Sequence, residues 1–180
     1  MLRGGHNVHN ACAAAALGYV CGIPLEKTIE GLEASLPEVG RQEINTNTDG
    51  VLVINDAYNA NPDSMRASLS TFASMDVSGR RIAVLGDMGE LGDFAQACHE
   101  GIGKVIAELP IDYLLCIGEL AGYIASAALE SGFPRDRIET TLSRGEALGI
   151  LEPLVEEGDA VLVKASHSME LERIVRGLLS

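Results

Sequence analysis

Between Val51 and Ser180 the sequence alternates short apolar runs with longer segments of helical periodicity. The apolar runs are rich in Val, Ile and Leu and are closed by polar or glycine-containing turns, which is the pattern of buried strands. Regular alternation of strand and helix implies right-handed crossovers. We therefore predict an α/β fold, with a Rossmann-like, mainly parallel sheet and helices on both faces. The expected strands are 51–55, 81–86, 112–117, 137–141 and 159–164, with 42–46 as a candidate edge strand, and the expected helices are 62–75, 93–108, 120–131, 144–152 and 168–179.

The first 37 residues have a different pattern and contain no expected strand. Residues 7–21 are rich in alanine and predict a helix, with Asn7 as its N-cap and Gly22 as its end. A second helix is expected over 25–35, after Pro24 and before a stop at Pro37. We expect this helical hairpin to form a separate unit that leaves some apolar surface uncovered.

Composition and charge exclude several classes of protein. The 180-residue chain carries a formal net charge of −13, which argues against general affinity for nucleic acid. Residues 1–10 lack the apolar core of a signal peptide, and the longest apolar stretch, 11–20, is too short to span a bilayer. Four cysteines show no CxxC spacing and no accompanying histidine cluster. We therefore expect a cytoplasmic chain with no metal site, no nucleic-acid partner and no membrane association.

The strongest candidate site follows the expected strand 51–55. Ligands of open α/β sheets bind at the carboxyl ends of strands. Asp56, Tyr58, Asn59 and Asn61 lie where such groups are expected, and Pro62 then opens a helix. Asn and Asp are equally the ordinary residues of turns and helix caps, so spacing alone leaves the two interpretations open.

Other strand ends are also polar or rich in glycine. Asp87 follows the strand at 81–86, Glu119 follows the next, and Lys164 ends the last. The sequence has no GxGxxG turn after a strand, no GxxxxGK[ST] phosphate loop and no GxSxG nucleophile motif. We expect no residue of this chain to be sufficient by itself for phosphoryl transfer.

Several stretches together resemble the Mur ligases of peptidoglycan synthesis. GHNVHNACAA is similar to the family pattern GxHNxxNxxAA, and GRQE is similar to GRxE. NDAYNANPDSM and VLGDMGELG, with His99 downstream, resemble the branch that adds D-alanyl-D-alanine. VLVKASHSMELE resembles the terminal pattern VKGSRxMxxE. The resemblance runs along essentially the whole chain, yet it would cover well under half of a complete ligase.

The resemblance implies a domain organisation and a reaction. Residues 38–180 would be the Rossmann-like C-terminal domain, and residues 1–37 the last helices of the central ATPase domain. The implied reaction adds D-alanyl-D-alanine to UDP-MurNAc-tripeptide through an acyl phosphate, with ATP and Mg²⁺. The phosphate loop and the metal ligands would belong to the missing central domain, so the isolated chain is expected to be inactive. Its partners would then be those two substrates and the missing N-terminal and central domains of the same ligase.

The resemblance also implies roles for matching residues on the nucleotide side. Asn7 and Asn10 would contact the adenine and ribose side of ATP, and Arg41 would meet the phosphates. Asp56 would hold the ribose or the adjacent phosphate network. The implied ATP-binding set is completed by three residues of the same loop, Tyr58, Asn59 and Asn61. Each of these residues has a plainer alternative, as a helix cap, a packing residue or a solvated side chain.

On the other side of the reaction, Lys164, Ser166 and His167 would face the incoming dipeptide. The plainer alternative for Lys164 is a surface lysine with a solvated head. Two departures stand in this stretch: Ala165 replaces the usual Gly, and His167 replaces the usual Arg. A histidine is only partly charged near neutral pH, so this change bears on the binding of a carboxylate. His99 is expected to pack or cap rather than react.

Other interpretations remain open. A receiver-like signalling domain also has a parallel sheet, with acids at strand ends and a lysine after a late strand. Asp56 or Asp87 could serve as its phosphoacceptor, with Lys164 as that lysine. The Asn-rich sequence after Asp56 argues against it. Another ATP-dependent ligase, such as a folylpolyglutamate synthase relative, is a second alternative. A pure interaction domain with idle polar strand ends is a third.

Overall fold

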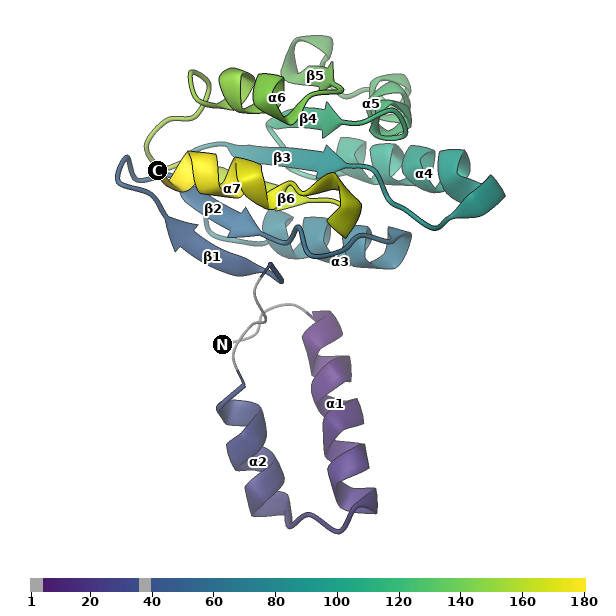
Figure 1. Cartoon of the computed structure of the whole chain (residues 1–180), viewed down its shortest axis with the longest axis vertical. Coiled ribbons are helices and arrows are strands. Elements are labelled where there is room, and N and C mark those ends of the chain that lie inside the picture. The colour runs from purple at the N-terminus through teal and green to yellow at the C-terminus, as the bar shows by residue number, and fades with distance from the viewer. Residues whose placement is uncertain (1–4, 36–39) are drawn as a thin grey trace. The chain divides into compact units, whose positions relative to one another are not determined.

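The protein is described here by a computed structural model that covers residues 5–35 and 40–180. The chain divides into two compact units, Met1–Glu38 and Val39–Ser180. Among its described residues, 5–35, the first unit contains two helices and no strand, and the second unit contains the sheet (Figure 1).

The first unit is the expected helical hairpin. Helix α1 spans Gly5–Val20 and helix α2 spans Leu25–Glu33. The expectation that Asn7 is the N-cap is wrong, because α1 already begins at Gly5 and Asn7 lies in its first turn. Gly22 has φ +75°, the left-handed conformation that lets the chain leave α1, and Pro24 precedes α2 as predicted. The predicted stop at Pro37 lies outside the described residues.

The second unit contains a six-stranded sheet in the order β1-β2-β6-β3-β4-β5 (Figure 1). Every neighbouring pair is parallel except β1 with β2, which is antiparallel. This confirms the predicted mainly parallel sheet, and the candidate edge strand becomes β1. The strands are β1 (Glu43–Thr46), β2 (Leu52–Asn55), β3 (Arg81–Gly86), β4 (Tyr113–Ile117), β5 (Ile138–Thr141) and β6 (Ala160–Lys164).

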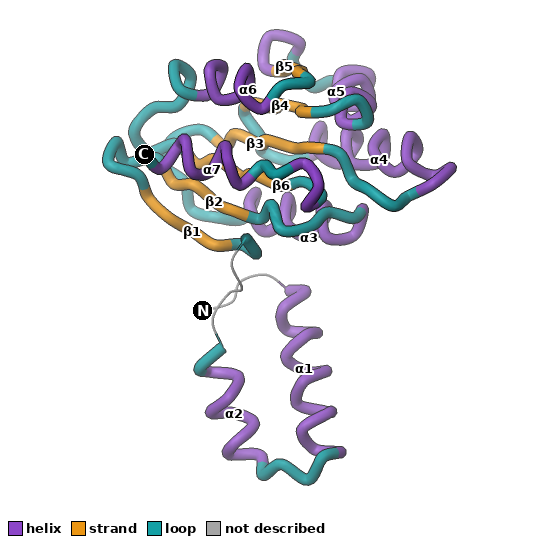
Figure 2. Tube along the Cα trace, viewed as in Figure 1, coloured by secondary structure: helices purple, strands orange, loops and turns teal. Residues whose placement is uncertain are grey.

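Helices cover both faces of the sheet, as Figure 2 shows. Alternate residues of β3 point to opposite cores: Ala83 and Leu85 pack on one side, and Ile82 and Val84 on the other. One core includes side chains of α3, α4 and α5, and the other includes those of α6 and α7. The helices are α3 (Pro62–Ala73), α4 (Ala95–Glu108), α5 (Ala121–Glu130), α6 (Arg144–Leu151) and α7 (Glu172–Leu179).

Three short 3-10 turns modify the predicted helix boundaries. They are η1 (Gly92–Phe94), η2 (Arg135–Arg137) and η3 (His167–Met169). The helix expected over 168–179 starts only at Glu172, because Glu170 adopts a left-handed conformation with φ +47°. Arg144 holds this residue in place by an ion pair of 2.6 Å to the Glu170 carboxylate. Hydrogen bonding from Arg144, with the nearby charge of Arg173, lowers the pKa of Glu170.

Across residues 5–35 and 40–180, no helix combines the length and apolar character needed to cross a membrane. The same described residues contain no group of three or more His, Cys, Asp or Glu side chains arranged to hold a metal ion.

Candidate functional site

The candidate site lies where the order of the strands changes direction. Strands β2 and β3 follow each other in the sequence, but β6 is inserted between them in the sheet. All three strands are parallel, so their carboxyl ends meet at one edge. Ligands of open α/β sheets bind in the crevice at such a position. The structure therefore brings Asp56 and Lys164 together, although they are far apart in the sequence.

Asp56 and Lys164 form a buried ion pair. The distance from Lys164 Nζ to Asp56 Oδ2 is 2.8 Å, and the two side chains are 3% and 11% exposed. The ammonium also donates to the carbonyl oxygen of Asn59 at 2.9 Å, and Asp56 Oδ1 accepts from the amide of Gln42 at 3.2 Å. The alternative of a solvated surface lysine is wrong, because a charge as deeply buried as this one needs a partner and has one.

Ser166 and His99 fix the loop after β3. The Ser166 hydroxyl accepts a hydrogen bond of 2.6 Å from the amide of Gly89. His99 is fully buried on α4, and its Nε2 accepts from the amide of Met88 at 2.9 Å. His99 Nδ1 lies 2.6 Å from the carbonyl of Ala95, so the proton is assigned to Nδ1. His99 therefore packs and caps, as expected from its spacing.

Arg41 and His167 both lie next to the ring of Tyr58, and all three side chains are exposed. The guanidinium carbon of Arg41 lies 4.3 Å from the centre of the Tyr58 ring. The imidazole ring of His167 also lies next to the Tyr58 ring, with 5.9 Å between the ring centroids and an angle of 47° between the ring planes. The residues expected on the nucleotide side, Arg41 and Tyr58, are therefore adjacent to one expected on the dipeptide side. A cationic group next to aromatic rings is suited to hold anionic groups.

The asparagines of the loop act mainly as local backbone partners. Asn61 is the N-cap of α3: its side chain accepts from the amide of Ser64, and the Ser64 hydroxyl accepts from the amide of Asn61. The side-chain oxygen of Asn59 accepts from the amide of Ala60 at 2.8 Å. The capping alternative therefore describes Asn61, and its role toward a nucleotide stays a prediction.

Asn7 and Asn10 lie on the other unit, on one face of α1. The amide of Asn10 donates to the side-chain oxygen of Asn7 at 3.2 Å, as their spacing of three residues allows. The two asparagines therefore do not belong to the site at the edge of the sheet. Their implied contact with adenine and ribose stays a prediction.

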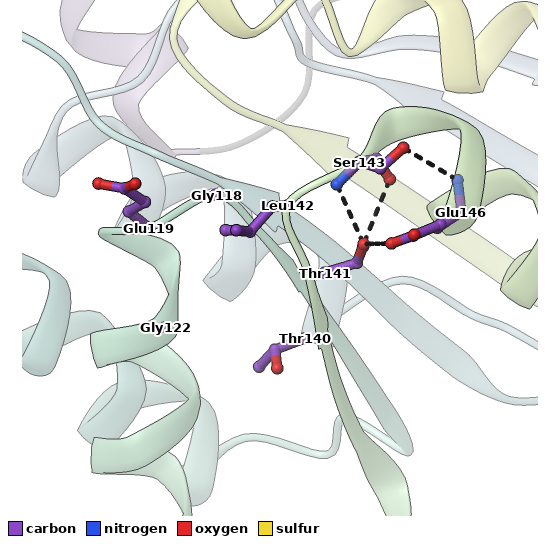
Figure 3. A pocket seen from close by; sticks show the side chains of 8 residues that line it. All are labelled: Gly118, Glu119, Gly122, Thr140, Thr141, Leu142, Ser143 and Glu146. Carbon is purple, nitrogen blue, oxygen red and sulfur yellow. Dashed lines mark hydrogen bonds between the residues drawn. The ribbon is translucent and has the colours of Figure 1, made fainter.

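Apart from the site around Asp56 and Lys164, a pocket lies over the ends of β4 and β5, with a volume of about 600 Å³ (Figure 3). None of the predicted ligand-binding residues lines it. Three of its residues are hydrogen-bonded to one another: the hydroxyl of Thr141 donates to the Glu146 carboxylate at 2.5 Å, and the Ser143 hydroxyl accepts from the amide of Glu146. The lining residues are Gly118, Glu119, Gly122, Thr140, Thr141, Leu142, Ser143 and Glu146.

Asp87 caps a helix rather than opening toward a ligand. Its Oδ1 accepts from the amide of Ala121, the first residue of α5, at 2.7 Å. Gly118 has φ +119°, and a Cβ there would collide with the Asp87 carboxylate. This arrangement does not suit the phosphoacceptor pair that the receiver-like interpretation needs.

Sequence reasoning missed Gly40 and Gln42. The carbonyl of Gly40 accepts from the amide of Tyr58 at 3.0 Å, and the amide of Gln42 donates to Asp56. Both residues have positive φ, +75° and +49°. The GRQE segment singled out Arg41 alone, although its glycine already signalled a special backbone conformation next to that arginine.

Comparison with known proteins decides the family. Residues 40–167 match the family model described as "Mur ligase, glutamate ligase domain". The chain belongs to the Mur ligase family. The match begins at Gly40 and includes β1 to β6, so it contains the strand ends that carry Asp56 and Lys164. This outcome confirms the resemblance and favours neither the receiver-like interpretation nor the folylpolyglutamate synthase interpretation.

Individual Mur ligases are similar over nearly the whole chain. UDP-N-acetylmuramoyl-tripeptide–D-alanyl-D-alanine ligase of Bacillus subtilis is 39% identical over 178 residues, which are 99% of this chain and 39% of that protein. A crystal structure of MurF from Acinetobacter baumannii gives a TM-score of 0.84 at 34% identity, covering 99% of this chain and 38% of that one.

A second similar structure carries a nucleotide. MurF ligase from Thermotoga maritima in complex with ADP gives a TM-score of 0.77 at 27% identity, covering 98% of this chain and 38% of that chain. This chain therefore spans about two fifths of the length of the ligases that it matches.

Proposed function

We propose that this chain is the C-terminal part of an ATP-dependent ligase that adds D-alanyl-D-alanine to UDP-MurNAc-tripeptide. The carrying observation is the similarity to the ligase of Bacillus subtilis over 99% of this chain, hairpin included. In the proposed reaction, the substrate carboxylate is phosphorylated to an acyl phosphate, and the amine of the dipeptide then attacks it. Because ATP and a nucleotide-linked substrate are used, the reaction belongs in the cytoplasm.

Within this proposal, the contribution of the chain is to bind and orient. The guanidinium of Arg41 is planar and permanently charged, so it suits a phosphate oxygen at the edge of the sheet. Asp56 has two carboxylate oxygens with room for further donors beyond Lys164 and Gln42, which fits the implied contact with ribose. Holding reactive groups in a fixed geometry is itself a large part of catalysis in such a reaction.

His167 is the proposed contact on the dipeptide side. It stands beside Tyr58 and 4.0 Å from the carboxylate of Glu172. A histidine attracts a carboxylate only when it is protonated, whereas an arginine is charged at every working pH. We therefore expect the KM for D-alanyl-D-alanine to fall in a His167→Arg variant, measured at neutral pH.

Residues 1–37 are proposed to be the final helices of the central ATPase domain. Both helices of the hairpin leave apolar side chains exposed, among them Leu17 (65%), Tyr19 (84%) and Leu25 (67%). An exposed apolar surface of this kind commonly marks an interface with another part of a protein. The proposed occupant of this surface is the rest of the central domain, which would also supply the phosphate loop and the Mg²⁺ ligands. The isolated chain is accordingly proposed to be inactive.

Reconstitution tests the proposal. The missing N-terminal and central domains, taken from a similar ligase, are supplied as a separate polypeptide, and ADP release is measured with UDP-MurNAc-tripeptide and a panel of amines. We expect release only with both polypeptides, and with D-alanyl-D-alanine rather than L-alanine or D-glutamate. ADP release that depends on a single amino acid, and not on D-alanyl-D-alanine, would reject the proposed substrate.

A further inference from the structure

The ammonium group of Lys164 is hydrogen-bonded entirely within the protein. Its ammonium lies 2.8 Å from the Asp56 carboxylate, 2.9 Å from the Asn59 carbonyl and 3.5 Å from the Asp56 carbonyl. An ammonium has three donors, and all three acceptors belong to the loop that joins β2 to α3. The side chain is 3% exposed. Lys164 therefore has neither a free donor nor an open path toward a ligand.

The loop held by Lys164 in turn holds the segment that carries Arg41. Asp56 Oδ1 accepts from the amide of Gln42, and the amide of Tyr58 donates to the carbonyl of Gly40. Arg41, which lies between Gly40 and Gln42, stacks its guanidinium on the Tyr58 ring at 4.3 Å. The loop thus contacts this segment on both sides of Arg41 and at the side chain itself.

The backbone of that segment needs such support. Gln42 has φ +49°, a conformation that residues with a side chain rarely adopt. A strained residue keeps its conformation only where its surroundings impose it. Its amide hydrogen bond to Asp56 is one such constraint, and Asp56 is itself fixed by Lys164.

We propose that Lys164 is a positioning residue, which sets the place of Arg41 through Asp56 and the loop 56–60, rather than a contact to the dipeptide. Without the ammonium, the buried carboxylate of Asp56 has no charged partner and turns toward water. The amide of Gln42 then loses its acceptor, and Tyr58 loses the fixed loop that presents its ring to Arg41. The effect on catalysis rests on the proposed function, in which Arg41 meets the phosphates of ATP.

The first test needs no activity. Amide hydrogen exchange at Gln42 and Tyr58 is measured by NMR in the 180-residue chain and in three variants. Lys164→Met keeps the length of the side chain and removes its donors. Lys164→Met with Asp56→Asn removes both charges, while the Asn oxygen can still accept from Gln42. Lys104→Met is the matched control, because Lys104 is an exposed lysine on α4.

The proposal gives each variant a distinct result. We expect exchange at the two amides to accelerate about tenfold or more in Lys164→Met, to return toward the original rate in the double variant and to stay unchanged in Lys104→Met. Unchanged exchange in Lys164→Met would overturn the proposal. If that variant does not fold, the double variant decides. Slow exchange at the amides of Gln42 and Tyr58 supports the proposal, and fast exchange at these amides rejects it.

The second test uses the reconstituted ligase. We expect Lys164→Met to raise the KM for ATP by about tenfold while the KM for D-alanyl-D-alanine stays the same. A rise in the KM for the dipeptide alone would show that Lys164 touches that substrate. If the unaltered chain supports no ligation, the proposed function fails, and the exchange measurement still decides whether Lys164 positions the Arg41 segment.

Discussion

At the scale of single residues, the chain stabilises buried charge by pairing it. Asp159, just before β6, receives hydrogen bonds from the side chain and amide of Arg80 and from the amide of Glu156. Burial alone would raise the pKa of Asp159, but these bonds and the charge of Arg80 outweigh it and hold the pKa below its usual range. This clamp joins the starts of β3 and β6, at the edge opposite the candidate site.

Asp159→Asn is expected to lower the free energy of unfolding by about 2 kcal/mol at pH 7, because the charged hydrogen bonds to Arg80 are lost. A depressed pKa contributes stability above the unfolded value of about 4, and this contribution disappears as the pH falls through the folded value. Urea unfolding of the original chain and of Asp159→Asn is measured at neutral pH and near pH 2. The difference between their free energies of unfolding should be smaller at the acidic pH. Asp136→Asn, at an exposed position, is the control. An equal difference at both pH values would contradict this account.

The capping role of Asn61 gives a second prediction. Asn61→Ala removes the acceptor of the Ser64 amide and should destabilise the protein by about 1 kcal/mol, whereas Asn61→Asp should be tolerated, since Asp is also a good N-cap. Thermal unfolding measures both variants. A stable Asn61→Ala variant with impaired ATP binding would show instead that this side chain serves the ligand first.

Among residues, sequence reasoning mostly succeeded where the interaction is local, although the N-cap expected at Asn7 is wrong because α1 begins earlier, at Gly5. It failed where the interaction is long-range. The cap at Asn61, the packing of His99 and the polar strand ends follow from neighbours within a few positions. The burial of Lys164 could not be predicted from its own surroundings, because its partner Asp56 lies 108 residues away. The same holds for Gln42, whose conformation is imposed by a loop that is contributed by another strand.

At the scale of elements, apolar runs and helical spacing predicted the helices and strands well. Each expected strand is present. The central strands β3, β4 and β6 are predictable because a buried parallel strand is apolar along most of its length, whereas the edge strand β5 has two exposed residues. The insertion of β6 between β2 and β3 is a long-range pairing that local patterns do not encode. The delayed start of α7 is similar, since Arg144 of α6 stabilises the turn at Glu170 that interrupts it.

The packing of α4 on α5 depends on Gly103. A Cβ at this position would collide with the carbonyl oxygen of Ile124 and lie 2.8 Å from Ala127. We expect Gly103→Ala to destabilise the protein by about 1–3 kcal/mol in urea unfolding. Gly149→Ala on α6 is the matched control, because nothing lies within 4 Å of its Cβ position, and it should be neutral or slightly stabilising. Equal effects of the two substitutions would show that helix propensity, not close packing, dominates.

At the scale of the whole molecule, the two units differ in how completely they bury their apolar residues. The unit Val39–Ser180 has two apolar cores, one on each face of its sheet. In the hairpin, α2 contains no buried residue, and Tyr19 and Val20 at the end of α1 are 84% and 80% exposed. Because the chain spans about two fifths of the length of its relatives, we propose that the remaining domains of the ligase cover this surface.

We propose that this chain completes a ligase for D-alanyl-D-alanine, and the mass of the reaction product is the most direct test of that proposal. The chain is mixed with the missing N-terminal and central domains, ATP, Mg²⁺, UDP-MurNAc-tripeptide and D-alanyl-D-alanine, and the nucleotide-linked product is analysed by mass spectrometry. We predict a product that gains the dipeptide with loss of water, formed only when both polypeptides are present and lost with Asp56→Ala. An unchanged tripeptide, with both polypeptides folded and associated, would contradict the account.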